Sequence, residues 1–285
     1  MTGLVLEGGA FRGLFTAGVL DGLLDMEADI RYVIGVSAGS TNACSYLSRQ
    51  RGRNLQIMEQ FLHHPRYLGW KNFLHGRAIM DMDFVFDEIP KTLLPFDYPV
   101  FNAYPGKFII GVYNLQTGED EYYPHTQLDE HSLLLRASCS IPLLFPPVLL
   151  QNGRYADGGL GDPIPFERSM ADGNRKNLII LTQPADYRKR LTSADEWTAR
   201  FYGHRYPQLA QTVLNRWRHY NSQLDACRQL EKEGEAMVLC PSPGLSVSRF
   251  EKDKERLRAL YQDGYRQVIE KKEQLLAFID AGNAL

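Results

Sequence analysis

Gly35 and Gly39 flank Ser37 in a G-x-S-x-G pentapeptide, which follows the apolar run 32–34 and precedes small residues that can form a helix. At a strand-to-helix transition this motif places the serine on a sharp turn, because only glycine tolerates the crowding on either side. The serine hydroxyl then projects beyond the edge of the sheet. We therefore expect a strand, a nucleophile elbow formed by Gly35 and Gly39, and a helix, with Ser37 presented as a nucleophile.

The chain begins with another unit of the same kind. The apolar run 4–6 is followed by a glycine-rich loop, residues 8–13, and then by apolar residues at helical spacing between 15 and 24. Two strand–helix units within the first fifty residues predict a parallel sheet. Further strands are expected at 108–112 and 119–123, as a hairpin that extends the sheet antiparallel, and at 154–156, 178–182 and 237–239.

The remaining segments are predicted to be mostly helical. We expect a short helix near 83–94 inside an otherwise irregular aromatic segment, 54–106, and helices at 128–138, from 207 onward and through 257–279. No internal repeat and no linker divides the sequence. The prediction is an α/β protein with one domain over residues 1–285, comprising a motif-bearing core of about 3–185 and a helical C-terminal part of about 186–285.

The composition excludes several classes of function. With 44% hydrophobic residues, 23% charged residues and a net charge of −2, the chain has no basic excess, and we expect no nucleic-acid partner. The four cysteines lack C-x-x-C spacing, so we predict free thiols and no metal site. The sequence starts directly with a strand, without an export signal, and its most apolar stretch, 141–150, is too short to span a membrane. We expect a cytoplasmic protein, in peripheral contact with a membrane at most.

A nucleophilic serine needs a base for its proton and hydrogen-bond donors for the oxygen of the attacked carbonyl. The glycine-rich loop offers such donors, because backbone amides converge between a strand and the start of a helix, where the helix dipole favours an anion. The expected oxyanion-hole residues are Gly8, Gly9, Ala10, Phe11, Arg12 and Gly13. The loop also approximates the G-x-G-x-x-G motif of a dinucleotide site, but such a site needs an acidic residue at the end of the second strand, where this chain has Gly35. We therefore favour the oxyanion hole and expect no cofactor.

The base is expected to be a carboxylate. The seven histidines, none of them in a sequence context typical of a catalytic base, are His63, His64, His75, His125, His131, His204 and His219. Asp157 ends the short strand predicted at 154–156 and precedes Gly158 and Gly159, so its carboxylate can reach the sheet edge that carries Ser37. By itself, an Asp-Gly-Gly sequence is also a common turn.

Three motifs occur here in the order and spacing of a known family. The chain resembles the patatin-like phospholipase family, whose members show D-G-G-G-x-R/K-G, then G-x-S-x-G, then D-G-G/A, matched here by residues 7–13, 35–39 and 157–159. Residues 137–147 resemble the family's A-S-x-A-x-P-x-x-F-P-P segment, so the resemblance covers about residues 3–185. It implies a three-layer α/β/α sandwich with a mainly parallel central sheet, and a Ser-Asp dyad with Ser37 as nucleophile and Asp157 as base. It also implies that residues 8–13 form the oxyanion hole.

The chain departs from the family pattern at three positions, where Glu7 replaces aspartate, Ala10 replaces the central glycine and Ser140 replaces alanine. Ala10 matters most, because alanine is strained if the loop needs a positive φ at that position. An aspartate with the ordinary pKa of about 3.9 is a weak base at neutral pH, so the dyad requires an environment that raises the pKa. We therefore predict that Asp157 is desolvated beside Ser37.

The leading interpretation is a serine acyl hydrolase that cleaves carboxylic esters of phospholipid or lysophospholipid through an acyl-serine intermediate. The aromatic segment 61–104 and the apolar stretch 141–150 are expected to form a groove for the acyl chain. The basic run 188–190 either contacts anionic headgroups or forms a solvated loop. Two alternatives stay open: an α/β-hydrolase with a Ser-His-Asp triad, and a non-catalytic lipid- or nucleotide-binding module of the same fold.

Overall fold

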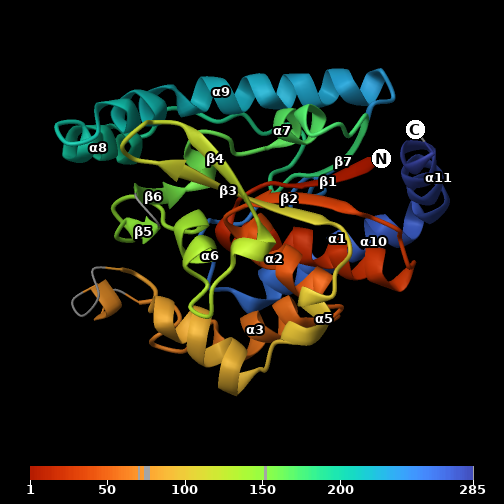
Figure 1. Cartoon of the computed structure of the whole chain (residues 1–285), viewed down its shortest axis with the longest axis horizontal. Helices are drawn as coiled ribbons and strands as arrows, with labels where there is room; N and C mark the ends of the chain where they lie inside the picture. The colour runs from red at the N-terminus through yellow and green to blue at the C-terminus, as the bar shows by residue number, and fades with distance from the viewer. Residues whose placement is uncertain (70, 74–77, 151–152, 285) are drawn as a thin grey trace.

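A mixed sheet forms the centre of the molecule (Figure 1). The computed structural model describes residues 1–69, 71–73, 78–150 and 153–284. Its strands are β1 (Thr2–Leu6), β2 (Tyr32–Val36), β3 (Lys107–Asn114), β4 (Asp120–Pro124), β5 (Val148–Leu150), β6 (Gly153–Asp157), β7 (Lys176–Ile180) and β8 (Ala236–Leu239). Hydrogen bonds link them in the order β5-β6-β3-β2-β1-β7-β8, with β4 paired to β3 outside this path. The strands from β3 to β8 in that order are parallel, whereas β4, β5 and β6 pair antiparallel with their neighbours.

Helices cover both faces of this sheet (Figure 1). One face carries α7 (Phe166–Ala171), α8 (Ser193–Tyr202) and α9 (Pro207–Lys232), and the other carries α1 (Leu14–Asp25), α2 (Ala38–Leu47) and α10 (Lys254–Glu270). Outside the second layer lie α3 (Arg53–Phe61), a π-helix (Phe84–Leu93) and α5 (Tyr98–Asn102), while α6 (Leu133–Ser138) packs on β3, β5 and β6 and α11 (Lys272–Asn283) contacts β1 and β7. The predicted three-layer α/β/α sandwich with a mainly parallel sheet is confirmed.

The alternation of side chains along β1 shows how the two layers share the sheet. Leu4 and Leu6 pack in one hydrophobic cluster with residues of α1, α2 and α10, whereas Val5 packs in a second cluster with residues of α7 and α9. All three side chains are fully buried, as expected for a parallel strand that is covered on both faces. Leu257 and Leu260 of α10 belong to the first cluster, so the last third of the chain contributes to the same core.

The strands β2 and β6 meet end to end along one side of β3. β2 pairs with β3 up to Val36, which lies opposite Gly111, and β6 approaches from the other direction with Asp157 opposite Val112. The other side of β3 is occupied by β4. Because neighbouring residues of β3 face the ends of both strands, Ser37, which follows β2, and Asp157, which ends β6, are brought together.

Several elements differ from the sequence-based expectation. The predicted hairpin forms, but its first strand, β3, runs parallel to β2, and only β4 is antiparallel. Segment 54–106 is more regular than expected, because α3 and α5 form in it, and α8 and β5 were not expected either. These helices are short. In α3 the apolar residues Leu55, Met58 and Phe61 do recur at helical spacing and pack on the core, so the sequence carried a signal for this helix that the prediction overlooked.

Two predicted helices also have different bounds. The helix expected at 128–138 is confined to α6, and the helix expected through 257–279 divides at Lys271 into α10 and α11. Trp70 and His75 lie outside the described residues.

Candidate active site

Ser37 lies on the turn between β2 and α2 with φ of 52° and ψ of −125°. A positive φ is strained for any residue except glycine, and such strain is typical of a functional turn. Gly39 allows this turn to pack against β1, because a Cβ atom at this residue would lie 2.4 Å from the carbonyl oxygen of Leu6. The backbone N–H of Ser37 donates a hydrogen bond of 2.9 Å to Oγ of Ser138, which in turn donates to the carbonyl oxygen of Gly111 at 2.8 Å.

The side chain of Ser37 is paired with that of Asp157. Oγ of Ser37 donates a hydrogen bond of 2.7 Å to Oδ2 of Asp157, while Oδ1 accepts the backbone N–H of Gly159 at 2.8 Å. The backbone N–H of Asp157 donates to the carbonyl oxygen of Ser140, so the strand end is fixed as well as the side chain. Gly158 is required by the close packing on β3, because a Cβ atom there would lie 2.3 Å from the carbonyl oxygen of Gly111.

The environment of Asp157 makes its carboxylate a stronger base than an exposed aspartate. Burial raises the pKa of Asp157, because the charged form loses its hydration, and only 6% of the residue is exposed. The hydrogen bonds from Ser37 and Gly159 and the positive charges of Arg216 and Arg249 oppose this rise without cancelling it. The structure therefore places a desolvated carboxylate beside the serine hydroxyl, as the sequence predicted.

The glycine-rich loop passes beside Ser37. Gly8 lies next to the serine, since a Cβ atom on Gly8 would be 3.1 Å from Cβ of Ser37. Residues Ala10–Gly13 form a short 3₁₀-helix that leads directly into α1. Two of the loop's amides are already engaged, because Phe11 N–H donates to the carbonyl oxygen of Arg249 and Arg12 N–H donates to that of Gly9. The amides of Gly8, Gly9 and Ala10 therefore remain as the candidate donors to a substrate oxygen.

Ala10 has the conformation that the family's glycine favours. Its φ is 50°, in the left-handed region where a Cβ atom is strained. The loop thus keeps a shape suited to glycine although it carries alanine. The rest of the predicted site residues support the turn, since Gly13 packs against Asn42 of α2, Gly35 packs against Gly39, and Nε of Arg12 donates to the carbonyl oxygen of Val247.

Glu7, which replaces the family's aspartate, fixes the start of the glycine-rich loop through hydrogen bonds of its side chain. Its carboxylate accepts hydrogen bonds from the backbone N–H of Thr182, which follows β7, and from the hydroxyl of Tyr220 on α9. Burial raises the pKa of Glu7, and these two hydrogen bonds and the charge of Arg12 oppose the rise. Glu7 therefore ties the end of β1 to a neighbouring strand and to the helix layer.

Two cavities meet at Ser37. The larger has a volume of about 430 Å³ and is lined mainly by apolar side chains of α2, α3, the π-helix and α6, including Ile57, Met82 and Phe86. The smaller has a volume of about 190 Å³ and is lined by Asp157, by four basic side chains and by apolar side chains such as Leu143, Leu160 and Val213. Ala10, Ser37 and Ile141 line both cavities and so form the boundary between them.

The described histidines lie away from this pair of cavities. None of His63, His64, His125, His131, His204 and His219 lines either cavity, and His75 lies outside the described residues. Within the described ranges, no group of three or more His, Cys, Asp or Glu side chains has the arrangement of a metal site. Among the described residues, Asp157 supplies the carboxylate that accepts the hydrogen bond of Ser37.

Several residues of this site were not found from the sequence. Ser138 supports the backbone of Ser37, and Arg216 donates from Nε to the carbonyl oxygen of Gly159 at 2.6 Å. Arg249 accepts from the oxyanion loop through its backbone and lines the smaller cavity through its side chain. Arg216 and Arg249 belong to the C-terminal part, where no motif marked them, and only the A-S-x-A-x-P stretch gave a signal for Ser138.

The fold and the site define an α/β protein that presents a serine on a strand–turn–helix elbow beside a buried aspartate. The model of the family described as patatin-like phospholipase matches residues 4–169. The chain therefore belongs to the patatin-like phospholipase family. A second model, described as a domain of unknown function (DUF6363), matches residues 206–280. This second region supplies β8 to the central sheet and α10 to its core.

The curated proteins that are similar to this chain include the following two. An uncharacterized protein, YjjU, from Escherichia coli strain K12 is 28% identical over 188 residues, which cover 64% of this chain and 52% of that protein. A probable lipid hydrolase, 463L, from Invertebrate iridescent virus 6 is 25% identical over 194 residues, covering 61% of this chain and 65% of that protein. The chain thus spans between half and two thirds of the length of these relatives.

A solved structure can also be superposed on the chain. The crystal structure of VipD from Legionella pneumophila aligns with a TM-score of 0.49 and 13% sequence identity, covering 99% of this chain and 67% of that one. In the part of the chain that the structure describes, no helix combines the length and the apolar character needed to cross a membrane.

Proposed function

We propose that the protein is a serine acyl hydrolase that cleaves carboxylic esters of phospholipid or lysophospholipid, with Ser37 as nucleophile and Asp157 as base. One observation carries this proposal: a buried hydroxyl donates to a buried carboxylate at 2.7 Å, at the boundary between an apolar cavity and a smaller cavity that carries basic side chains. Membership of the patatin-like phospholipase family and similarity to a probable lipid hydrolase support it. No cofactor takes part.

The proposed reaction has two halves. Asp157 accepts the proton of Ser37 as Oγ attacks the ester carbonyl carbon, and the amides of Gly8, Gly9 and Ala10 donate to the resulting oxyanion. The tetrahedral intermediate collapses, the alcohol leaves with the proton from Asp157, and an acyl-serine remains. Water then attacks this ester while Asp157 accepts one of its protons. As the second intermediate collapses, Asp157 returns this proton to Oγ of Ser37 and the carboxylic acid is released.

The larger cavity is the proposed acyl site. Its lining draws on both segments that were expected to form a groove, with Tyr67 and Phe86 from the aromatic segment and Ile141 and Phe145 from the apolar stretch. Aliphatic chains gain roughly 0.8 kcal/mol for each CH₂ group that is removed from water, so such a cavity favours an acyl chain. Several of these aromatic side chains, such as Phe86, are also part of the hydrophobic core.

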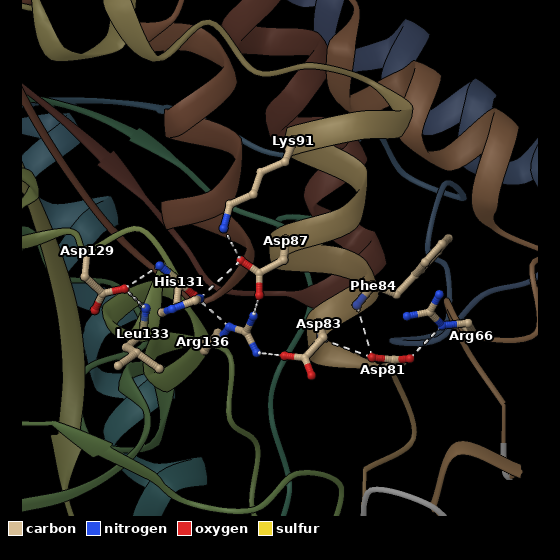
Figure 2. A network of polar contacts seen from close by, with 10 residues as sticks. All are labelled: Arg66, Asp81, Asp83, Phe84, Asp87, Lys91, Asp129, His131, Leu133 and Arg136. Carbon is tan, nitrogen blue, oxygen red and sulfur yellow. Dashed lines mark hydrogen bonds and ion pairs between the residues drawn. The ribbon is translucent and has the colours of Figure 1, made fainter.

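A network of ion pairs joins α6 to the π-helix (Phe84–Leu93) that lines the larger cavity. Figure 2 shows Arg136 of α6 between Asp83 and Asp87, at the start of the π-helix that lines the cavity, and Lys91 also reaches Asp87. The side chains of Arg136 and Asp87 are 11% and 24% exposed, so this ion pair is better shielded than a surface pair, whereas Asp83 is 78% exposed. Because α6 also carries Ser138, the same helix contacts both the π-helix and the backbone of Ser37.

Hydrolysis of a panel of acyl esters, lysophospholipids and phospholipids tests the proposal, with the Ser37→Ala protein as blank. We expect wild type to release fatty acid and the variant to lose this activity. Replacing each histidine in turn should leave substantial activity, which separates the dyad from a Ser-His-Asp triad. A folded wild-type protein that hydrolyses none of these esters would instead favour the non-catalytic lipid- or nucleotide-binding module.

A further inference from the structure

The smaller cavity beside Ser37 collects positive charge from four separate parts of the chain. Its lining includes Arg12 of the oxyanion loop, Lys189 of the loop after β7, Arg216 of α9 and Arg249 of the segment before α10. These charges lie close enough to repel one another. The charge of Arg249 lowers the pKa of both Arg12 and Arg216, although burial is the larger cause in each.

None of these four cations has an ion-pair partner among the described residues. The three carboxylates that line the same cavity are already committed. Glu7 accepts from Thr182 and Tyr220, Asp157 accepts from Ser37 and Gly159, and Asp195 accepts at the N-terminus of α8. Four basic side chains face three carboxylates in this cavity, so positive charge is in excess. Repulsion among the partly buried cations destabilises the folded state, and a bound anion relieves that cost.

Hydrogen bonds to the backbone of Lys189 fix its position beside the cavity. Its N–H donates to Oδ1 of Asn221 and its carbonyl oxygen accepts from Nδ2 of the same residue, so α9 holds the loop from both sides. The two neighbours, Arg188 and Arg190, are exposed and do not line the cavity. Burial, followed by the charges of Arg216 and Arg249, lowers the pKa of Lys189 to about 7. The basic run is therefore divided, with one side chain in the cavity and two in solvent.

We propose that this cationic cavity, defined by Arg12, Lys189, Arg216 and Arg249, binds the phosphate group of the substrate's headgroup while the larger cavity holds the acyl chain. The inference rests on the proposed function, because it places the scissile ester between the two at Ser37. Guanidinium groups suit phosphate oxygens, since they donate several hydrogen bonds in a fixed plane. The preferred substrate class is then an acyl ester that carries an exposed phosphate monoester, such as a lysophosphatidic acid.

Three octanoyl esters with the same acyl chain test this preference: octanoylglycerol 3-phosphate, octanoylglycerophosphocholine and octanoylglycerol. For wild type we expect kcat/KM to be highest for the phosphate monoester and lowest for the uncharged ester. In Arg249→Gln and Lys189→Gln, the ratio of kcat/KM for the phosphate monoester to that for the uncharged ester should fall at least tenfold, mainly through KM. The matched controls Lys252→Gln and Arg190→Gln remove exposed cations from the same two segments, before α10 and after β7, and should preserve the wild-type ratio.

A binding measurement with Ser37→Ala protein separates this inference from the proposed function. Titration calorimetry with glycerol 3-phosphate, glycerol and inorganic phosphate should show binding of glycerol 3-phosphate that weakens at least tenfold in the Ser37→Ala/Arg249→Gln double variant. Ester hydrolysis without any preference for phosphate would overturn the headgroup site and leave the hydrolase intact. Binding of inorganic phosphate alone, with no preference among the esters, would also overturn it. Failure to hydrolyse any ester, with glycerol 3-phosphate still bound, would overturn the hydrolase instead.

Discussion

Oγ of Ser37 donates a hydrogen bond of 2.7 Å to Oδ2 of Asp157, although 120 positions separate these residues in the chain. The contact follows from the pairing of β3, whose neighbouring residues lie opposite the end of β2 and the end of β6. The catalytic pair that we propose is therefore a product of sheet register. The strained turn and the buried charge destabilise the fold, and packing of the surrounding core offsets this cost.

Asp157→Asn should abolish turnover without reducing stability. General-base catalysis contributes about 100- to 10,000-fold to rate, so we expect kcat to fall within that range or further. The folded state raises the pKa of Asp157, so it binds the proton more tightly than the unfolded state does, and the ionised carboxylate destabilises the fold above the ordinary pKa of 3.8. Asparagine removes this cost at neutral pH. Thermal unfolding at pH 7 should give a midpoint at or above that of wild type, and a clear decrease would contradict the assignment of a strained, desolvated base.

Arg216→Gln should shift the acidic limb of the pH–rate profile to higher pH. The positive charge of Arg216 lowers the pKa of Asp157, so its removal lets the pKa rise further, and a higher pH is then needed to ionise the base. The measurement is kcat/KM against pH with an uncharged nitrophenyl ester, which makes no use of the cationic cavity. Arg218→Gln, on the exposed side of α9, is the control and should reproduce the wild-type profile. An unchanged limb in Arg216→Gln would show that Arg216 does not influence the base.

Ala10→Gly should stabilise the protein. At φ of 50° alanine carries a strain of about 1 kcal/mol or more, which glycine lacks, although glycine loses more backbone entropy on folding. We expect a net gain of up to about 1 kcal/mol in denaturant unfolding. The control is Ala277→Gly at an exposed position of α11, where the same substitution should cost about 1 kcal/mol. A loss of stability at both positions would refute strain at Ala10.

Ser138→Ala tests whether Ser138 positions the nucleophile. The substitution leaves the buried N–H of Ser37 and the carbonyl oxygen of Gly111 without their partner, which costs about 1 to 3 kcal/mol. We expect kcat to fall while KM for a nitrophenyl ester stays nearly constant, because the elbow is misplaced and the acyl cavity is intact. Ser48→Ala is the control, since Ser48 is buried and hydrogen-bonded at the end of α2 but distant from the turn. Equal loss of kcat in both variants would show that Ser138 contributes to the stability of the fold and does not specifically position Ser37.

The sequence predicted those parts of the site that depend on local backbone geometry. A serine between two glycines, after a strand and before a helix, can adopt few conformations, so Ser37 was placed on its turn without long-range information. Asp157 was found because it ends a strand and precedes small residues. The sequence left open whether position 10 needs a positive φ, and the structure gives Ala10 a φ of 50°.

The parts that the sequence missed depend on packing between distant segments. Arg216 lies on a long helix with many polar residues, and nothing in its local sequence distinguishes it from the exposed Arg218. Arg249 comes from an irregular segment that touches the oxyanion loop through its backbone. The helix α3 is an exception, because Leu55, Met58 and Phe61 recur at helical spacing and could have predicted it. The prediction of one domain over 1–285 stays a prediction, although β8 and α10 extend the sheet and core of the patatin-like region.

The most direct test of the Ser37–Asp157 pair is covalent labelling with a fluorophosphonate, followed by mass spectrometry of the labelled peptide. We expect a single adduct on Ser37 in wild type, none in Ser37→Ala, and labelling at least 100-fold slower in Asp157→Asn, because the hydroxyl then lacks its base. Folded wild-type protein that forms no adduct, or that is labelled equally fast without the carboxylate of Asp157, would contradict the proposed dyad.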